Sequence, residues 1–157
     1  MKVTISEITV PTWDKAWKIF IPVDPVPASR PRMARKSGRV YYGKRYNEFR
    51  KVAGLLLAAT EMPVEFPLQG PIAVSAEFTI AHPKKTKRLA PRGDVDNYFK
   101  TLDVLNEVIW WDDDQILWAS MSKRYGEQTG ILLEVKQIDS IPETRKLSEL
   151  WEQRQPS

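Results

Sequence analysis

Carboxylates and one lysine are concentrated between residues 94 and 114, in a chain whose formal net charge is +4. Asp94 and Asp96 are two residues apart, Lys100 follows Asp96 by four residues, and three consecutive aspartates occupy residues 112–114. Crowded carboxylates repel one another, and a divalent cation relieves that repulsion. Because Mg²⁺ prefers hard oxygen ligands, usually one or two carboxylates plus substrate phosphate and water, this stretch favours a magnesium site that acts on a phosphodiester.

The spacing of Asp94 and Asp96 is compatible with two structures. If the chain is extended just before a helix, their side chains point to the same side, with alpha carbons about 6–7 Å apart. Two carboxylates at that distance can converge on one cation. The alternative is that Asp94 belongs to a turn and Asp96, or Asn97, caps the following helix.

Lys100 is expected on the same face of that helix as Asp96, one turn further on. There it could steady a scissile phosphate or the charge that develops in the transition state. In the alternative interpretation it forms only a surface ion pair with Asp96 or Asp103.

The triple aspartate lies between strongly apolar neighbours, Trp110-Trp111 before it and residues 116–118 after it, which argues against a simple solvated turn. If the backbone is extended here, Asp112 and Asp114 face one way and Asp113 faces the other. The pattern alone therefore leaves both assignments of the metal ligand open.

Basic residues cluster in two other stretches. Residues 30–51 contain nine Lys or Arg and a single acid, and residues 84–92 contain five more and no acid. A clustered basic surface is the electrostatic footprint of a polyanion-binding protein, although a solvated face is the alternative. The candidate DNA-binding residues are Arg30, Arg32, Arg35, Lys36, Lys84, Lys85, Lys87, Arg88 and Arg92.

Hydrophobic periodicity predicts an α+β fold: one mixed domain with a small, mostly antiparallel sheet, two main helices and a short C-terminal helix. Alternating residues predict strands at 17–26, 39–42, 72–80, 116–123 and 130–138. We expect 19–42 to form a hairpin with a long basic loop, and the last two strands to form an antiparallel pair. Helices are expected at 46–60 and from Asp96 or Asn97 through Ile109, with Phe99, Leu102, Leu105, Val108 and Ile109 as the buried stripe. The spacing of Ser140 and Glu143 predicts the start of the C-terminal helix.

Length and composition limit the remaining possibilities. A chain of 157 residues is expected to be one domain, with its core at about 18–138 and a helix and tail at 139–157. The absence of cysteine excludes disulfides, a thiolate zinc site and a cysteine nucleophile. No signal peptide or membrane span is expected, and a cytoplasmic, nucleoid-associated location follows. His82, the only histidine, is expected to be structural or incidental.

Several motifs together resemble the RusA-type Holliday junction resolvases, which are often found in phages and prophages. They are the leader VPASRPR, the segment RYNEFR and, above all, RGDVDNYFKTLDVLNEVIWWDDDQI. The family pattern combines D-x-D-N, a lysine four residues after the second acid, D-x-L-N and D-D-x-Q-I. Gln115-Ile116 align Asp112 and Asp113 with the family's acid pair. The resemblance thus implies Asp94, Asp96 and Asp113 as catalytic metal ligands, Asp112 as an additional ligand and Lys100 as the essential basic residue.

The resemblance covers roughly residues 19–137 and implies the function. The family's enzymes are homodimers that use Mg²⁺, with Mn²⁺ as a substitute, and no organic cofactor. They resolve four-way DNA junctions by paired symmetric incisions in recombination and repair. Two alternatives remain: a non-catalytic module that binds branched DNA, and a metal-dependent nuclease acting on flaps or forks. Of the adjacent tryptophans, Trp110 and Trp111, we expect one in the core and one at a dimer interface, with base stacking as an alternative for one of them.

Overall fold

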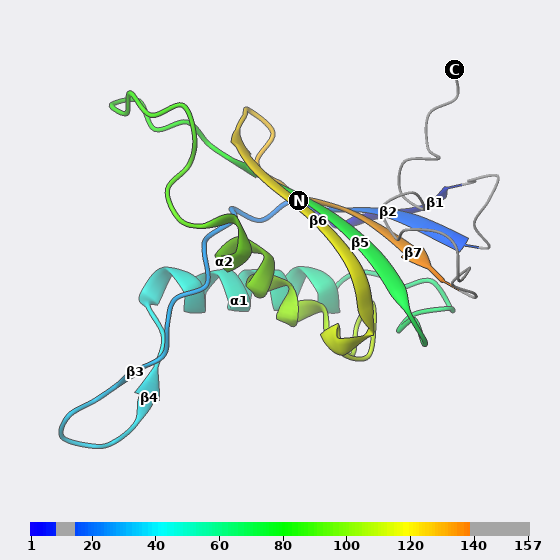
Figure 1. Cartoon of the computed structure of the whole chain (residues 1–157), viewed down its shortest axis with the longest axis horizontal. Helices are drawn as coiled ribbons and strands as arrows, with labels where there is room; N and C mark the ends of the chain where they lie inside the picture. The colour runs from blue at the N-terminus through cyan, green and yellow to red at the C-terminus, as the bar shows by residue number, and fades with distance from the viewer. Residues whose placement is uncertain (9–14, 139–157) are drawn as a thin grey trace.

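The computed structural model describes residues 1–8 and 15–138. A five-stranded sheet in the order β1-β2-β7-β5-β6 is covered on one face by the helices (Figure 1). The predicted α+β fold with a mostly antiparallel sheet is confirmed, since only β5 and β6 pair in parallel. No helix in this part of the chain is long and apolar enough to span a membrane. The elements are β1 (Thr4–Ile8), β2 (Lys15–Ile21), β3 (Arg32–Met33), β4 (Val40–Tyr41), α1 (Lys44–Ala58), β5 (Ile72–Ile80), α2 (Val95–Phe99), the 3₁₀ helices η1 (Lys100–Leu105) and η2 (Asp113–Gln115), β6 (Ile116–Tyr125) and β7 (Gly130–Gln137).

The core lies between the sheet and α1. Every second residue of β5 from Ile72 to Phe78 is at most 1% exposed, as its alternating pattern predicts. Helix α1 confirms the predicted helix at 46–60, starting two residues earlier and ending at Ala58. It buries Tyr46, Phe49, Ala53 and Leu57, whose spacing of three or four residues forms one helical face. These residues belong to the same hydrophobic cluster as the inward side chains of β5.

The expected hairpin at 19–42 is wrong. Strand β2 pairs with β1 and β7 instead, and it ends at Ile21 because Pro22 and the prolines after it cannot donate to a strand ladder. A much smaller hairpin forms further on, where β3 pairs with β4. The predicted turn at Ser37-Gly38 closes it, with Gly38 at a φ of 66° that favours glycine.

The predicted pairing of the last two strands is also wrong. Strands β6 and β7 form close to their expected positions, but β5 lies between them, parallel to β6 and antiparallel to β7. Their connection passes the end of β5, where the Gly126 amide donates to the Ile80 carbonyl at 3.0 Å. An alternating pattern determines which side chains face the core, but it does not identify the neighbouring strand.

The long second helix expected from Asp96 or Asn97 is broken. Helix α2 has only five residues and continues as the 3₁₀ helix η1, and Asp94 occupies the N-cap position. The expected buried stripe is nevertheless largely confirmed, with Leu102, Leu105 and Ile109 buried. Phe99 and Val108 are only partly buried. The predicted C-terminal helix lies outside the described residues.

Candidate active site

Helix α2 carries the first acidic pair, in a geometry that matches neither alternative in full, since the N-cap is Asp94 and not Asp96 or Asn97. Asp94 has an extended backbone, with φ −73° and ψ 144°, whereas Asp96 already lies in the first turn of the helix. Both side chains are exposed. The Asp94 carboxylate makes no capping hydrogen bond to the helix, so its oxygens remain available to bind a cation or a solvent molecule.

Lys100 lies where its spacing predicts, one turn after Asp96. Its Nζ is 3.2 Å from Asp96 Oδ2 and 3.2 Å from Asn97 Oδ1. The hydrogen bond from Lys100 lowers the pKa of Asp96, so this carboxylate stays ionised over the physiological range. Because the Lys100 and Asp96 side chains are 63% and 58% exposed, a phosphate can reach both of them.

Residues 112–115 form a second acidic group, called here the acidic turn. The backbone is not extended as expected but folds into a 3₁₀ turn, in which Asp112 Oδ1 accepts from the Asp114 amide at 3.0 Å. Gln115 Oε1 accepts from the Asp112 amide at 2.9 Å, which completes a capping box. Gln115 Nε2 also donates to the Leu68 and Gly70 carbonyls, each at 2.9 Å, and so attaches the acidic turn to the preceding loop.

Asp112 and Asp113 of the acidic turn shift each other's pKa in opposite directions. The Asp114 amide and the Asp113 side chain lower the pKa of Asp112, whereas the hydrogen bond to Asp112, together with partial burial, raises the pKa of Asp113. The pair therefore retains a proton more readily than two isolated aspartates. A divalent cation can replace such a proton, because it relieves the same repulsion.

Asp103 lies close enough to the acidic turn to act on it electrostatically. Its carboxylate contributes to the raised pKa of Asp113. The pKa of Tyr46 on α1 is also raised, mainly by burial and secondly by the Asp103 charge. The η1 segment thus brings a further acid toward the acidic turn. The sequence prediction had considered Asp103 only as an ion-pair partner of Lys100.

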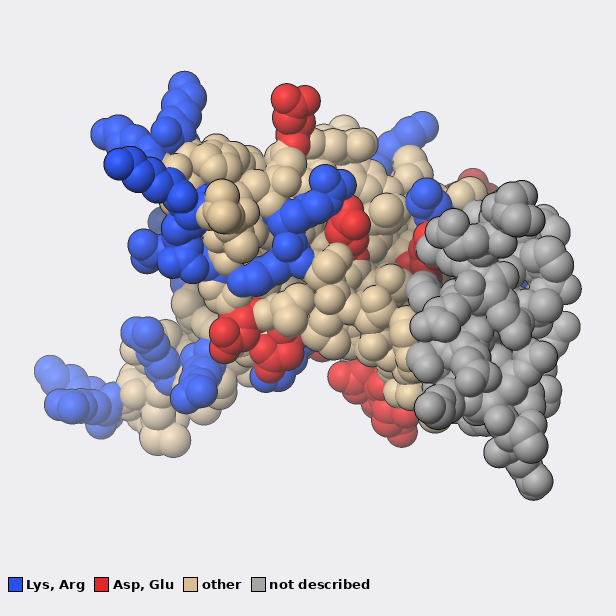
Figure 2. Space-filling model, turned by 45° about the horizontal axis from the view of Figure 1, so that its top comes forward, with Lys and Arg blue, Asp and Glu red and all other residues tan. Residues whose placement is uncertain are grey.

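The basic residues project on either side of α2. Figure 1 shows the β3–β4 hairpin and the long loop after β5 extending from the same end of the molecule, with α2 between them. Lys and Arg side chains gather on both projections, and acidic side chains lie between them (Figure 2). Every one of the nine candidate DNA-binding residues is exposed, and none forms an ion pair with another described residue.

A comparison with known families identifies the chain. The family model described as endodeoxyribonuclease RusA matches residues 22–136, well over half of the sequence. The chain belongs to the RusA endodeoxyribonuclease family. This family comprises Holliday junction endonucleases. The chain is also similar to the uncharacterized protein YqaN of Bacillus subtilis (strain 168), with 27% identity over 140 residues, which covers 74% of this chain and 93% of that protein.

The RusA-family match includes both acidic groups and Lys100. RusA nucleases generally depend on divalent metals. Among the residues that the structure describes, no three His, Asp or Glu side chains stand close enough to hold one ion together. The donor chemistry still fits a hard cation, because one or two carboxylates can suffice when phosphate and water supply the other ligands.

The segment that leads into Asp94 is held by side chains to which the sequence prediction gave no role. Lys123 of β6 donates to the Pro91 carbonyl at 2.7 Å and to the Gly93 carbonyl. The Tyr98 hydroxyl donates to the Arg92 carbonyl at 2.7 Å. Three consecutive carbonyls before Asp94 are therefore fixed, which positions the first carboxylate of this RusA-family site.

Gly93 completes this arrangement, because no other residue fits there without strain. Its φ is +90°, and a Cβ at this position would meet Pro27 side-chain atoms at 3.1 Å. Lys123 is distant in sequence from these carbonyls, so no local pattern could have indicated the contact. By contrast, the spacing of Asp112 and Gln115 is a capping-box signal that the sequence prediction overlooked.

Proposed function

We propose that this RusA-family protein is a magnesium-dependent, structure-selective endodeoxyribonuclease that resolves four-way junctions by paired symmetric incisions. The observation that carries the proposal is the arrangement of acids and an exposed lysine between two basic projections. Phosphate contacts from the basic residues supply affinity, and the carboxylates between them suit a cation that acts on the bound phosphodiester.

In this proposal Asp94, Asp96 and Asp113 are the metal ligands, and Asp112 assists Asp113. Since no three carboxylates of the described residues are close enough to share an ion, one or two of them bind it together with substrate phosphate and water. When bound, Mg²⁺ activates water and stabilises the leaving oxygen. Lys100 presents its ammonium group to the phosphate at the point of cleavage, next to the Asp96 carboxylate. Lys123 and Tyr98 hold the backbone before Asp94, so that its carboxylate is oriented before DNA arrives.

Paired incision requires two sites with two-fold symmetry, which a homodimer supplies. Light scattering of the purified protein should give twice the mass of the 157-residue chain. A strict monomer, both free and bound to DNA, would contradict paired incision but not cleavage itself.

Two other functions use the same surface. A non-catalytic module that binds branched DNA would gain nothing from exposed carboxylates facing phosphates, since they weaken its affinity for a polyanion. A nuclease acting on flaps or forks would need the same residues. The catalytic residues therefore do not distinguish a junction nuclease from a flap or fork nuclease, and only a comparison of DNA substrates can.

A cleavage panel tests the proposal. Synthetic four-way junction, fork, flap and linear duplex are incubated with the protein at one salt concentration, with Mg²⁺ or with excess chelator. We expect paired nicks in the junction with Mg²⁺ only. Binding of the junction without cleavage under any divalent ion would support the non-catalytic module, and preferential cutting of the fork or flap would redefine the substrate.

Lys100→Ala is expected to lower the single-turnover cleavage rate about 100-fold, because a donor aimed at transition-state charge is lost. Binding should change no more than about threefold, since one phosphate contact contributes little in a multi-contact interface. Lys44→Ala is a matched control: Lys44 is an exposed helical lysine that pairs with Glu48 at i+4, 4.0 Å away. Equal losses of cleavage and binding in Lys100→Ala would make Lys100 an ordinary phosphate contact.

Combined replacement of Lys84, Lys85, Lys87 and Arg88 by alanine is expected to weaken binding and flatten its salt dependence. Each phosphate contact contributes about 0.9 to the slope of log K against log salt, so the slope should fall by about 2 to 4. Lys18→Ala on β2 serves as a single-charge control on an exposed residue outside both projections. An unchanged slope would remove this loop from the DNA surface.

A further inference from the structure

A cavity of about 510 Å³ lies beside the segment that leads into Asp94. Five parts of the chain meet around it: the proline-rich segment after β2, α1, the end of β5 with its following loop, α2 and the end of β6. Its lining includes several rigid rings, from Pro25, Pro27, Pro91, Tyr98 and Tyr125. Such a volume and lining suit a planar group of the size of a nucleobase.

The rim of this cavity is basic. Arg45, Lys85, Arg88 and Arg92 line it, and none of them forms an ion pair with a residue that the structure describes. Burial raises the pKa of the Tyr98 hydroxyl and the Arg45 guanidinium acts in the opposite direction, so Arg45 and Tyr98 are close in space. Aromatic and apolar walls below four cations form a site for a planar group joined to an anion.

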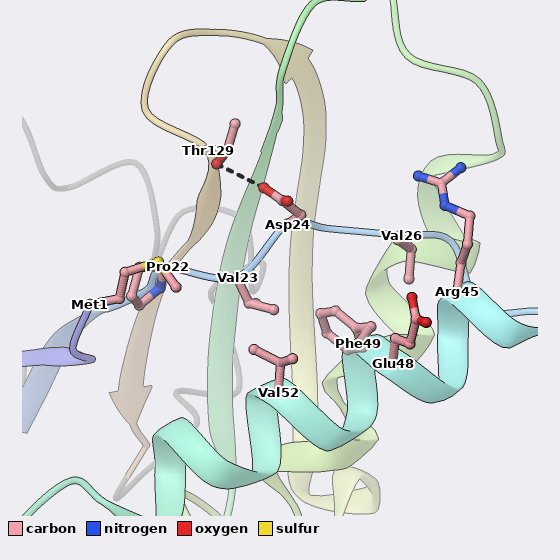
Figure 3. A pocket seen from close by; sticks show the side chains of 10 residues that line it. All are labelled: Met1, Pro22, Val23, Asp24, Val26, Arg45, Glu48, Phe49, Val52 and Thr129. Carbon is pink, nitrogen blue, oxygen red and sulfur yellow. Dashed lines mark hydrogen bonds between the residues drawn. The ribbon is translucent and has the colours of Figure 1, made fainter.

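A second cavity shares Arg45 with the first but has a different lining. It measures about 430 Å³ and is lined by Asp24 and Glu48 as well as Arg45 (Figure 3). Asp24 accepts a hydrogen bond from the Thr129 hydroxyl at 3.0 Å, and the Arg45 guanidinium points away from α1. Two carboxylates at this second cavity disfavour a phosphate, whereas the first has cations alone among its charged lining residues.

We propose that the basic cavity holds one unstacked nucleotide of the DNA strand that enters the active site, with its base against Tyr125 and its phosphates against the cationic rim. The proposal rests on the proposed nuclease function and deepens it. Tyr125 is partly exposed at the end of β6, and the His82 ring contacts it edge to face, with centroids 4.6 Å apart. Gly93 lines the cavity and Asp94 follows it, so a nucleotide held here is adjacent to the phosphate at the carboxylates.

This site accounts for a preference for branched DNA. A base in continuous duplex must leave its stack before it can enter a cavity, and that costs free energy, whereas a base at a branch point has already lost part of its stacking and pairing. Stacking on an aromatic ring recovers part of this cost for any base. The cavity would therefore favour junctions without reading their sequence.

A double-mutant cycle tests the proposal on the full-length protein in excess chelator, so that no strand is cut. One axis is Tyr125→Ala. The other is a four-way junction with a single abasic nucleotide, moved through the four positions on each side of the branch. Tyr125→Ala should weaken binding of the intact junction about tenfold and leave linear duplex binding within about twofold. At one abasic position the wild type should bind the junction about tenfold more weakly than it binds the intact junction. Tyr125→Ala should bind that abasic junction and the intact junction equally well.

Two further variants keep the test decisive. Tyr125→Phe should restore junction binding, because it retains the ring. Tyr125→Leu retains apolar bulk without a ring, so it should reproduce the loss even if the alanine variant is unstable. The base-binding site would be overturned if the losses of junction affinity from Tyr125→Ala and from the abasic nucleotide were additive at every position. It would also be overturned if Tyr125→Phe bound the junction as weakly as Tyr125→Ala. Failure of the proposed function is a separate outcome, seen when the wild type does not cut a junction with Mg²⁺.

Discussion

Asp96→Asn is expected to reduce junction cleavage by about 1,000-fold while leaving junction binding within about twofold of the wild type. The substitution removes a charged metal ligand, and the loss of several kcal/mol of metal-assisted stabilisation corresponds to that factor. In the wild type Lys100 Nζ donates to Asp96 Oδ2 at 3.2 Å. The asparagine amide keeps an oxygen that can accept this hydrogen bond, so the local fold should be retained. Cleavage is measured under single-turnover conditions with Mg²⁺, and binding is measured in chelator.

Asp114→Asn is the matched control for this experiment. It makes the same chemical change within the acidic turn, where Asp114 uses its backbone amide, not its side chain, to hold Asp112. We expect this variant to cut at close to the wild-type rate. Robust cutting by Asp96→Asn, or equal loss of cutting in both variants, would contradict the assignment of Asp96 as a specific metal ligand.

Trp110→Ala is expected to lower the free energy of unfolding by about 3–5 kcal/mol, which is a large part of the stability of a small domain. Trp110 is fully buried, and its Nε1 donates to Asn106 Oδ1 at 2.8 Å. The substitution leaves a large cavity and an unpaired amide oxygen. The melting temperature should fall by about 10 °C or more, and urea denaturation should show a lower midpoint.

Trp111→Ala provides the comparison. Its side chain is 50% exposed, so the same substitution at the next residue should change stability by no more than about 0.5 kcal/mol. Equal melting temperatures for the two variants would contradict the burial of Trp110. The expectation that one of these two tryptophans lies in the core is confirmed by Trp110, and a dimer-interface or base-stacking role for Trp111 remains a prediction.

Local patterns predicted much of the secondary structure because they depend on neighbouring residues alone. The helical spacing of apolar residues between Phe49 and Leu57 predicted α1 to within two residues at each end, and alternation predicted β5. The i+4 relation of Asp96 and Lys100 survives although α2 is short, because it needs only one helical turn. At two places the sequence left the backbone geometry open. In the structure Asp94 is extended at the N-cap while Asp96 is helical, and residues 113–115 form a 3₁₀ turn.

The residues that can do chemistry here are recognisable from their types and spacing: two acidic groups, one lysine a helical turn from the first, and two basic stretches. The sequence could not determine how they are brought together. Strand order, with β5 between β6 and β7, depends on hydrogen bonds between segments far apart in the chain. The contacts of Lys123 with the Pro91 and Gly93 carbonyls, and of Gln115 with those of Leu68 and Gly70, have the same origin. Only the tertiary structure decides such contacts, because each depends on where another element packs.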